Sequence, residues 1–293
     1  MKTVDFLGYS LYAGDRILDS LANKNKQTIV NTINPHSYCE AEKDLFYRQA
    51  LVDSDFLLPD GVGIIMAIWI LTRSQVKLFT GSDLHIQLLK KMNKASGKVF
   101  YMGSTPDTLQ KIQKRINREY PNILVETYSP PFKPIFSDKT NALILNAVND
   151  FQPDVLFIGM TAPKQEKWVS KHKHEIDANL IASVGAVFDF YAGTVPRPGK
   201  FWLWLHLEWL VRLISEPKRL WRRSFISTPL FLKDILLTKI GLLKHAKKKT
   251  TLEFKQLEIR RNMSRLMAEK EQLSMRNDLI ARDRDKLSMK NGL

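Results

Sequence analysis

The sequence predicts an α/β fold in which helices cover both faces of a parallel β-sheet. Short apolar runs that end in glycine or in a polar turn alternate with stretches of helical spacing. Such runs are typical of buried strands, and strands that alternate with helices of this length build parallel sheets. With 44% hydrophobic residues in 293 positions, the chain can also bury a sizeable core.

Each expected element follows from its own stretch of sequence. The first strand is TIVNTIN (28–34), and the second, DFLLPDG (55–61), leads into the apolar helix VGIIMAIWIL. Helical spacing returns in DLHIQLLKKMNK (83–94), before the strand KVFYMGS (98–104) and the helix PDTLQKIQKRINREY (106–120).

Two further strands, DVLFIGM (154–160) and LIASVGA (180–186), complete the alternation. Pro163 lies between them and suits the first turn of a helix. In parallel sheets of this kind, ligands bind outside the carboxyl ends of the strands. The residues that follow the strands are Thr32, Asn34, Asp60, Gly61, Gly63, Gly103, Ser104, Gly159, Gln165, Glu166, Gly185 and Asp189.

Asp60 carries the clearest chemical signal at this edge. It follows a predicted strand, and Gly61 and Gly63 allow the backbone to bend closely around it. A carboxylate beside a pocket can act as a general base if its surroundings raise its pKa. An aspartate here can equally cap the helix that follows, and the local sequence leaves both interpretations open.

Other residues of the edge suit the recognition of sugars and phosphates. Thr32 and Asn34 can each donate a hydrogen bond to a sugar hydroxyl or a phosphate. The backbone N–H groups at Gly103 and Ser104 can meet a phosphate, and the helix after Pro163 begins with a positive dipole end.

The sequence holds no G-x-G-x-x-G after a strand and no G-x-x-x-x-G-K-[ST], which argues against dinucleotide-binding enzymes and P-loop NTPases. Asp53 and Asp55 form a D-x-D pattern that in other enzymes holds a divalent metal on a nucleotide diphosphate. The same residues read more simply as a polar turn before a strand. Cys39 is the single cysteine, which fits a small buried filler and a reducing compartment.

Residues 196–249 contain 13 Lys and Arg but only 3 Asp and Glu, so most of the net charge of +15 is local to them. Pro196 and Gly199 mark the change from residues 1–195, which we expect to form the catalytic domain. The basic, tryptophan-rich region that follows predicts a helical part that meets an anionic membrane surface.

Residues 250–293 have a different character. Apolar residues recur at intervals of seven from Leu252 to Leu287, whereas the companion positions are largely polar. This pattern predicts a helix that forms a weak coiled coil, and hence a homo-oligomer. A lone amphipathic helix or a disordered tail is the alternative.

Six motifs together resemble one protein family in order and spacing. They are T-x-N (32–34), LPDGVGI (58–64), the GS turn (103–104), GMTAPKQE (159–166), SVGAVFDFYAG (183–193) and EWLVRLISEPKRLWRR (208–223). The chain resembles the TagA/WecG/CpsF family of bacterial glycosyltransferases, of the GT-E type, over about residues 3–225. The heptad segment lies outside the resemblance.

The resemblance implies a Rossmann-like body and an inverting transfer of a sugar from a UDP-sugar to a polyprenyl-pyrophosphoryl amino sugar. N-acetylmannosamine is the expected sugar, and cell-surface polysaccharide or teichoic-acid-type synthesis the expected setting. The alternative is a metal-dependent UDP-sugar transferase of exopolysaccharide or capsule synthesis, which would use Asp53 and Asp55 and move a different sugar, such as glucose. The resemblance also implies that no metal cofactor is obligatory.

The family's motifs assign roles to residues of this chain. Asp60 matches the proposed base, and Thr32, Asn34 and Gln165 match the family's other catalytic positions. The remaining residues of the edge are then expected to bind substrate. The family's C-terminal region closes over the site and contributes arginines, which here correspond to Arg212, Arg219, Arg222 and Arg223.

We expect a cytoplasmic protein held at the inner face of the cell membrane. The side chains expected at headgroup depth are Trp202, Trp204, Trp209, Trp221 and Lys218. A non-catalytic membrane scaffold is one alternative. A basic coiled-coil protein that binds nucleic acid is another, but too few basic residues precede the heptads for a recognition helix.

Overall fold

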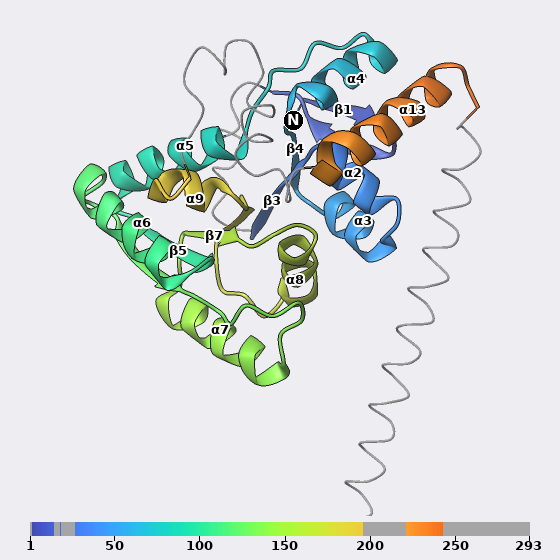
Figure 1. Ribbon diagram of the computed structural model, residues 1–293. Helices are drawn as coiled ribbons and strands as arrows, with labels where there is room; N and C mark the ends of the chain where they lie inside the picture. Colours follow the sequence, from blue (N-terminus) through green and yellow to red (C-terminus); the bar gives the residue numbers. More distant parts are fainter. Residues whose placement is uncertain (1, 15–17, 19–26, 196–220, 243–293) are drawn as a thin grey trace, which may run out of the picture. The chain divides into compact units, whose positions relative to one another are not determined.

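The computed structural model describes residues 2–14, 18, 27–195 and 221–242 (Figure 1). By contacts the chain divides into two units, Met1–Ile240 and Gly241–Leu293, and nearly all of the described residues belong to the first. The strands of this unit are β1 (Thr3–Phe6), β2 (Tyr9–Tyr12), β3 (Thr28–Ile33), β4 (Phe56–Pro59), β5 (Lys98–Gly103), β6 (Leu124–Tyr128), β7 (Val155–Gly159) and β8 (Leu180–Ser183).

Helices connect these strands. They are α2 (Pro35–Ala41), α3 (Leu45–Val52), α4 (Val62–Thr72), α5 (Gly81–Ala95), α6 (Pro106–Glu119), α7 (Asp138–Phe151), α8 (Lys164–His172) and α9 (Val187–Ala192). A π-helical turn, η1 (Arg223–Ser227), runs into α13 (Thr228–Lys239).

The strands form one eight-stranded sheet in the order β1-β2-β4-β3-β8-β7-β5-β6. Only β1 and β2 pair antiparallel, and all other neighbours are parallel. The predicted parallel sheet is therefore confirmed. After β4 the chain crosses to the other side of β3, where it forms β5, continues outward to β6 and returns through β7 to β8, which pairs with β3.

Alternate residues of the buried strands feed two separate cores, which confirms helices on both faces. Val99 and Tyr101 of β5 pack with α5, α6 and α9, whereas Phe100 and Met102 of the same strand pack with α7 and α8. A third core joins β1, β2 and β4 to α2, α3, α4 and α13.

Sequence analysis did not identify the β1–β2 hairpin or β6. The hairpin strands have only four residues each, and the chain turns between them at Leu7 and Gly8, both with positive φ. β6 lies at the edge of the sheet, so its side chains lack the continuous apolar pattern of a buried strand.

Part of the basic C-terminal region packs on the first unit. Phe231 and Ile235 of α13 are buried, and the ring of Phe231 lies 5.4 Å from that of Tyr38 on α2. The Cys39 thiol donates to the Ser227 carbonyl at 3.2 Å, and burial raises the pKa of this thiol to about 11. Figure 1 shows α13 beside α2 and α4.

None of the helices in the described ranges is long and apolar enough to cross a membrane. The tryptophans and lysine expected at headgroup depth lie outside these ranges, except for Trp221, and so do Arg212, Arg219 and the heptads.

Candidate active site

The residues predicted to follow strands lie on one side of the sheet, at the carboxyl ends of the parallel strands. Ile33 pairs with Pro59, and the Asp60 N–H donates to the Ile33 carbonyl at 2.8 Å. On the other side, Gly103 pairs with Gly159, where β5 and β7 end together. The alternation of strand and helix therefore gathers motifs that are up to 150 residues apart in the sequence.

Asp60 is not the cap of the helix that follows it. The N-cap position of α4 is Gly61, with φ of 90° and ψ of 149°. A left-handed φ of this kind favours glycine, and among the residues that the structure describes no neighbouring atom lies within 4 Å of where a Cβ would stand. The turn thus ends β4, starts α4 and leaves the half-buried Asp60 between them.

Asn34 uses one end of its side chain to cap α2. Its Oδ1 accepts from the N–H groups of His36 at 3.1 Å and Ser37 at 2.9 Å, and its own N–H donates to the Ser37 hydroxyl. These bonds fix the amide and leave its Nδ2 group as the donor that a substrate could meet. Thr32 is half-buried in β3, opposite Leu58.

The glycines on the far side of the edge are explained by close backbone packing. Gly103 has φ of 118°, and a Cβ there would lie 2.6 Å from the Gly159 carbonyl oxygen. A Cβ on Gly159 would meet the Phe188 ring at 2.3 Å. Ser104 also has positive φ, and its carbonyl accepts from the Ser129 hydroxyl at 2.8 Å. On the other side, a Cβ on Gly63 would lie 3.0 Å from the Pro35 ring.

Gln165 lies at the start of α8, with both ends of its amide engaged. Its Oε1 accepts from the Met160 N–H at 3.2 Å, and its Nε2 donates to Glu166 Oε1 at 2.9 Å. Gly185 has φ of 55°, and a Cβ on it would stand 3.7 Å from Gln165 Nε2, so the amide sits against this glycine.

Glu166 is placed differently from the expectation that it faces substrate. Only 2% of the residue is exposed, and burial raises the pKa of its carboxyl to about 7. Its side chain enters the protein interior beneath α8 instead of lining the open edge. The i,i+1 spacing in the motif hides this difference, because neighbouring helical residues point in different directions.

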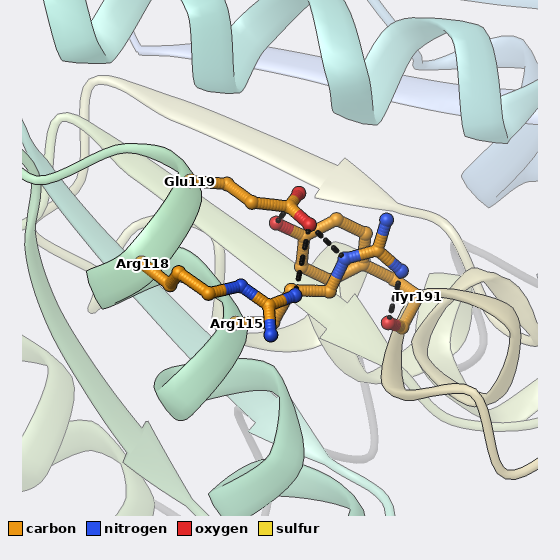
Figure 2. A network of polar contacts seen from close by, with 4 residues as sticks. All are labelled: Arg115, Arg118, Glu119 and Tyr191. Atoms are coloured by element: carbon orange, nitrogen blue, oxygen red, sulfur yellow. Dashed lines mark hydrogen bonds and ion pairs between the residues drawn. The ribbon is translucent and has the colours of Figure 1, made fainter.

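Asp189 lies in the first turn of α9, and its backbone carbonyl accepts from the N–H groups of Thr194 and Val195. Figure 2 shows how the end of α9 is tied to α6. Arg115 stacks on the Tyr191 ring and donates to the Tyr191 carbonyl at 2.8 Å, while Glu119 accepts from both side chains. This network fixes the C-terminal end of α9, the helix that follows Gly185, against α6.

Comparison with known proteins agrees with this arrangement. A family model described as "Glycosyl transferase WecG/TagA/CpsF family" matches residues 4–245. The chain belongs to this family. The predicted family is therefore confirmed, and the protein is a glycosyltransferase.

Similar proteins come from three bacteria. The chain is 31% identical to one from Bacillus subtilis (strain 168), over 71% of this chain and 78% of the relative. A second, from Bacillus spizizenii (strain W23), is 29% identical over 73% and 80%, and a third, from Staphylococcus aureus (strain MW2), is 26% identical over 80% and 93%. Each is named N-acetylglucosaminyldiphosphoundecaprenol N-acetyl-beta-D-mannosaminyltransferase.

Arg222 and Arg223 bring positive charge from the C-terminal region to the start of α2. Burial, followed by the charges of these arginines, lowers the pKa of His36 to about 4, with Arg223 having the larger effect. His36 Nδ1 lies 2.8 Å from the Ser227 hydroxyl, which joins η1 to the helix that Asn34 caps. Sequence analysis missed His36, although its place directly after the T-x-N motif was a signal.

The D-x-D pair of this glycosyltransferase lies at the amino end of β4, whereas Asp60 lies at its carboxyl end. Asp53 follows α3 and accepts from the Gln49 side chain, and Asp55 Oδ2 accepts from the Ile29 N–H at 2.9 Å. Four residues of β4 separate this pair from Asp60. Across the described ranges, no group of three or more His, Cys, Asp and Glu could hold a metal ion.

Proposed function

We propose that this glycosyltransferase moves N-acetylmannosamine from a UDP-sugar to an N-acetylglucosaminyl-diphospho-polyprenol at the inner face of the cell membrane. The names of the three relatives supply the transferred sugar and the acceptor class. The observation that carries the proposal is the position of Asp60, directly after β4 and next to Asn34, which follows the paired strand β3.

Asp60 would act as the general base. It would take the proton from the acceptor's sugar hydroxyl while that oxygen attacks the anomeric carbon of the donor. The bond from the anomeric carbon to the UDP oxygen breaks on the opposite face, so the configuration inverts. The Asn34 Nδ2 group and the Thr32 hydroxyl would hold the sugars in the orientation that this attack needs.

The departing UDP gains negative charge on its β-phosphate, and cationic forks can stabilise that charge. Arg222 and Arg223 are the described candidates, and Arg212 and Arg219 come earlier in the same region of the sequence. We infer no obligatory metal, since Asp53 and Asp55 lie at the amino end of β4 and already accept hydrogen bonds.

A membrane-docking surface on α4 and α13 would bring the lipid-linked acceptor to this base. Met66 and Trp69 on α4 are about half-exposed, and so are Leu232 and Leu236 on α13. Lys239 links the two helices by donating to the Ile70 carbonyl at 2.8 Å. We call these four apolar side chains the α4–α13 surface.

The α4–α13 surface is close to the chemistry. Arg73 stacks on Trp69 at 4.7 Å, and Lys233 and Lys239 are exposed, so apolar and cationic groups stand together as anionic lipid requires. Trp69 lies seven residues after the start of α4, or about 10 Å along the axis. Docking of this surface would therefore place Asp60 near the headgroups.

The proposal is tested by measuring UDP release from a panel of UDP-sugars, in detergent and EDTA, with and without a short-chain lipid-pyrophosphoryl-N-acetylglucosamine. We expect acceptor-dependent UDP release with UDP-N-acetylmannosamine and with no other UDP-sugar of the panel. Preference for UDP-glucose would reassign the sugar. Release that appears only after a divalent metal is added would favour the metal-dependent alternative at Asp53 and Asp55.

A further inference from the structure

The buried carboxyl of Glu166 belongs to a polar cluster under α8 that the proposed mechanism does not use. Asn31 of β3 is only 1% exposed, and its Nδ2 donates to the Ser54 hydroxyl at 2.9 Å, which in turn donates to the Ala50 carbonyl. Both hydrogen bonds run in one direction, from the Asn31 amide through Ser54 to α3. They use only the Nδ2 end of Asn31, so its amide oxygen takes no part in them.

Two atoms of this cluster lack partners within the described part of the chain. They are Asn31 Oδ1 and Glu166 Oε2, both buried. Asn31 and Glu166 line the same cavity of about 10 Å³, between β3, α3 and α8. That volume suits a single water molecule, and both residues can reach it.

A neutral Glu166 supplies from within the cluster the proton that these two atoms need, whereas an ionised Glu166 leaves two acceptors that depend on both protons of one water molecule. Asn31 Oδ1 is an acceptor, so whatever meets it, directly or through a water, must supply a proton. An ionised Glu166 would add a second acceptor to the same cavity. A neutral Glu166 would instead donate from Oε2 into the cavity while Oε1 accepts from Gln165 Nε2 at 2.9 Å.

This arrangement also decides which way the Gln165 amide faces. The Met160 N–H fixes Gln165 Oε1, and Glu166 Oε1 takes one of the two protons on Nε2. Gln165 is only 4% exposed, and within the described ranges its second Nε2 proton has no acceptor; the amide lies beside Gly185, which follows β8. An amide fixed at both ends presents this donor without further ordering.

We propose that Glu166 is a positioning residue, held as a neutral carboxylic acid, that orients the Gln165 amide toward the substrate. The inference rests on the proposed function, because Gln165 is taken to contact the sugar nucleotide or acceptor. Burial supports the neutral form, since it raises the pKa of the Glu166 carboxyl to about 7.

The groups that face Glu166 allow this state. Tyr47 on α3 is near Glu166, and burial raises the pKa of the Tyr47 hydroxyl well above its ordinary value, so Tyr47 stays neutral. Charged residues occur at the rim of the cavity and across the α3–α8 contact, where Lys167 pairs with Asp44 at 2.6 Å. The two rim residues are Asp53, after α3, and Lys173, after α8.

The test compares Glu166→Gln with the wild type in the full-length protein, using the rate of acceptor-dependent UDP release from pH 5.5 to about 9. Glutamine reproduces the neutral carboxyl, with one acceptor and one donor end. We expect wild-type kcat/KM to fall as pH rises through about 7, and Glu166→Gln to keep its activity on the alkaline side. Glu126→Gln, on an exposed strand edge, should keep the wild-type profile.

A second variant separates positioning from folding. Glu166→Leu fills a similar volume but cannot bond to Gln165, so kcat/KM should fall on the order of 10- to 100-fold while the thermal midpoint is retained. A Glu166→Gln enzyme that is inactive at every pH would overturn the proposal, because it would mean that the ionised carboxylate contacts substrate. If kcat/KM of Glu166→Gln falls above about pH 7 as it does in the wild type, the proposal is overturned as well.

Thermal unfolding gives a readout that does not depend on activity. A carboxyl with a pKa raised in the folded state contributes stability that is fully present below its unfolded pKa of about 4.5 and is lost as pH rises through about 7. Glu166→Gln should therefore gain stability relative to wild type across this window. If the wild type shows no transferase activity but this gain in stability appears, the proposed function fails while the neutral Glu166 stands. If the difference in stability between Glu166→Gln and wild type does not change with pH, the neutral Glu166 itself is refuted.

Discussion

The two halves of the sheet edge use their motif residues in different ways. On the β3–β4 half, Asn34 and Asp60 follow strands that pair directly, and a Cβ on Gly61 would meet no atom of the described residues within 4 Å. On the β5–β7–β8 half, Gly103 and Gly159 are packed so tightly that a methyl group would collide with a carbonyl or with the Phe188 ring.

The family's motifs therefore contain two kinds of residue: polar residues such as Asp60 that are suited to chemistry, and glycines such as Gly159 that are required by packing. Substituting Asp60 or the Asn34 donor, on the β3–β4 half, should change the rate with the fold intact. Substituting the packed glycines Gly103 and Gly159, on the β5–β7–β8 half, should change stability first. The predictions below test this division, in order of expected effect.

Asp60→Asn should give the largest change in rate. Asparagine keeps the size of the side chain but cannot accept the acceptor's proton, so turnover should fall by roughly 10²–10⁴. The thermal midpoint and the Kd for the UDP-sugar should stay close to wild type, measured by thermal unfolding and calorimetry.

Asp53→Asn is the matched control, since Asp53 is exposed at the other edge of the sheet. Its turnover should be unchanged with EDTA present. The reverse pattern, an active Asp60→Asn and a metal-dependent loss in Asp53→Asn, would overturn the division and favour the metal-dependent alternative.

Gly159→Ala should give the largest change in stability. Its Cβ would stand 2.3 Å from the Phe188 ring, which is itself buried, so the ring or the strand must move. Overpacking of this kind lowers the free energy of unfolding by about 1–3 kcal/mol. Denaturant titration measures it.

Gly61→Ala is the comparison on the other half. The Cβ of the new alanine would meet no described atom within 4 Å, so the cost comes from the left-handed φ, about 1–2 kcal/mol. Any repacking should be confined to Gly159→Ala, visible as a changed near-UV signal from aromatic residues. Equal signals from the two variants would contradict the packing argument.

The sequence predicted the buried half of the fold better than the site. Continuous apolar runs identified β3, β4, β5, β7 and β8, because strands buried on both faces carry a strong signal. Edge strands and short helices such as α2 carry a weak one. Asn34 shows the limit within the site: the sequence predicts a polar donor, but only the coordinates show that its oxygen caps α2.

Glu166 and His36 show a second limit. Their chemistry depends on burial and on neighbours from distant segments, such as Asn31 for the first and Ser227 for the second. No local pattern reports those neighbours. The roles of Arg212 and Arg219 stay predictions, because both residues lie outside the described ranges.

Asn34 can be divided experimentally into its two ends. Asn34→Asp keeps the oxygen that caps α2 and removes the Nδ2 donor, so stability should hold while kcat/KM falls about 10-fold. Asn34→Ala should lose the same activity and, in addition, about 1 kcal/mol of unfolding free energy. An Asn34→Asp enzyme with full activity would mean that this side chain only caps the helix.

The α4–α13 surface extends the comparison to the membrane, because α4 starts at the base on the β3–β4 half. Trp69→Ala and Leu236→Ala should each weaken binding to vesicles containing anionic lipid, by about 1 kcal/mol or about five-fold, since each side chain is half-exposed. Vesicle sedimentation measures the partition.

The matched control lies on the other half, where Leu143 of α7 is exposed to a similar degree, at 51% against 49% for Trp69. Leu143→Ala should leave vesicle binding unchanged. If all three variants bind equally well, the surface does not face lipid. If Trp69→Ala reduces both binding and turnover on the lipid-linked acceptor, but not turnover on a detergent-soluble one, then α4 connects membrane docking to the base.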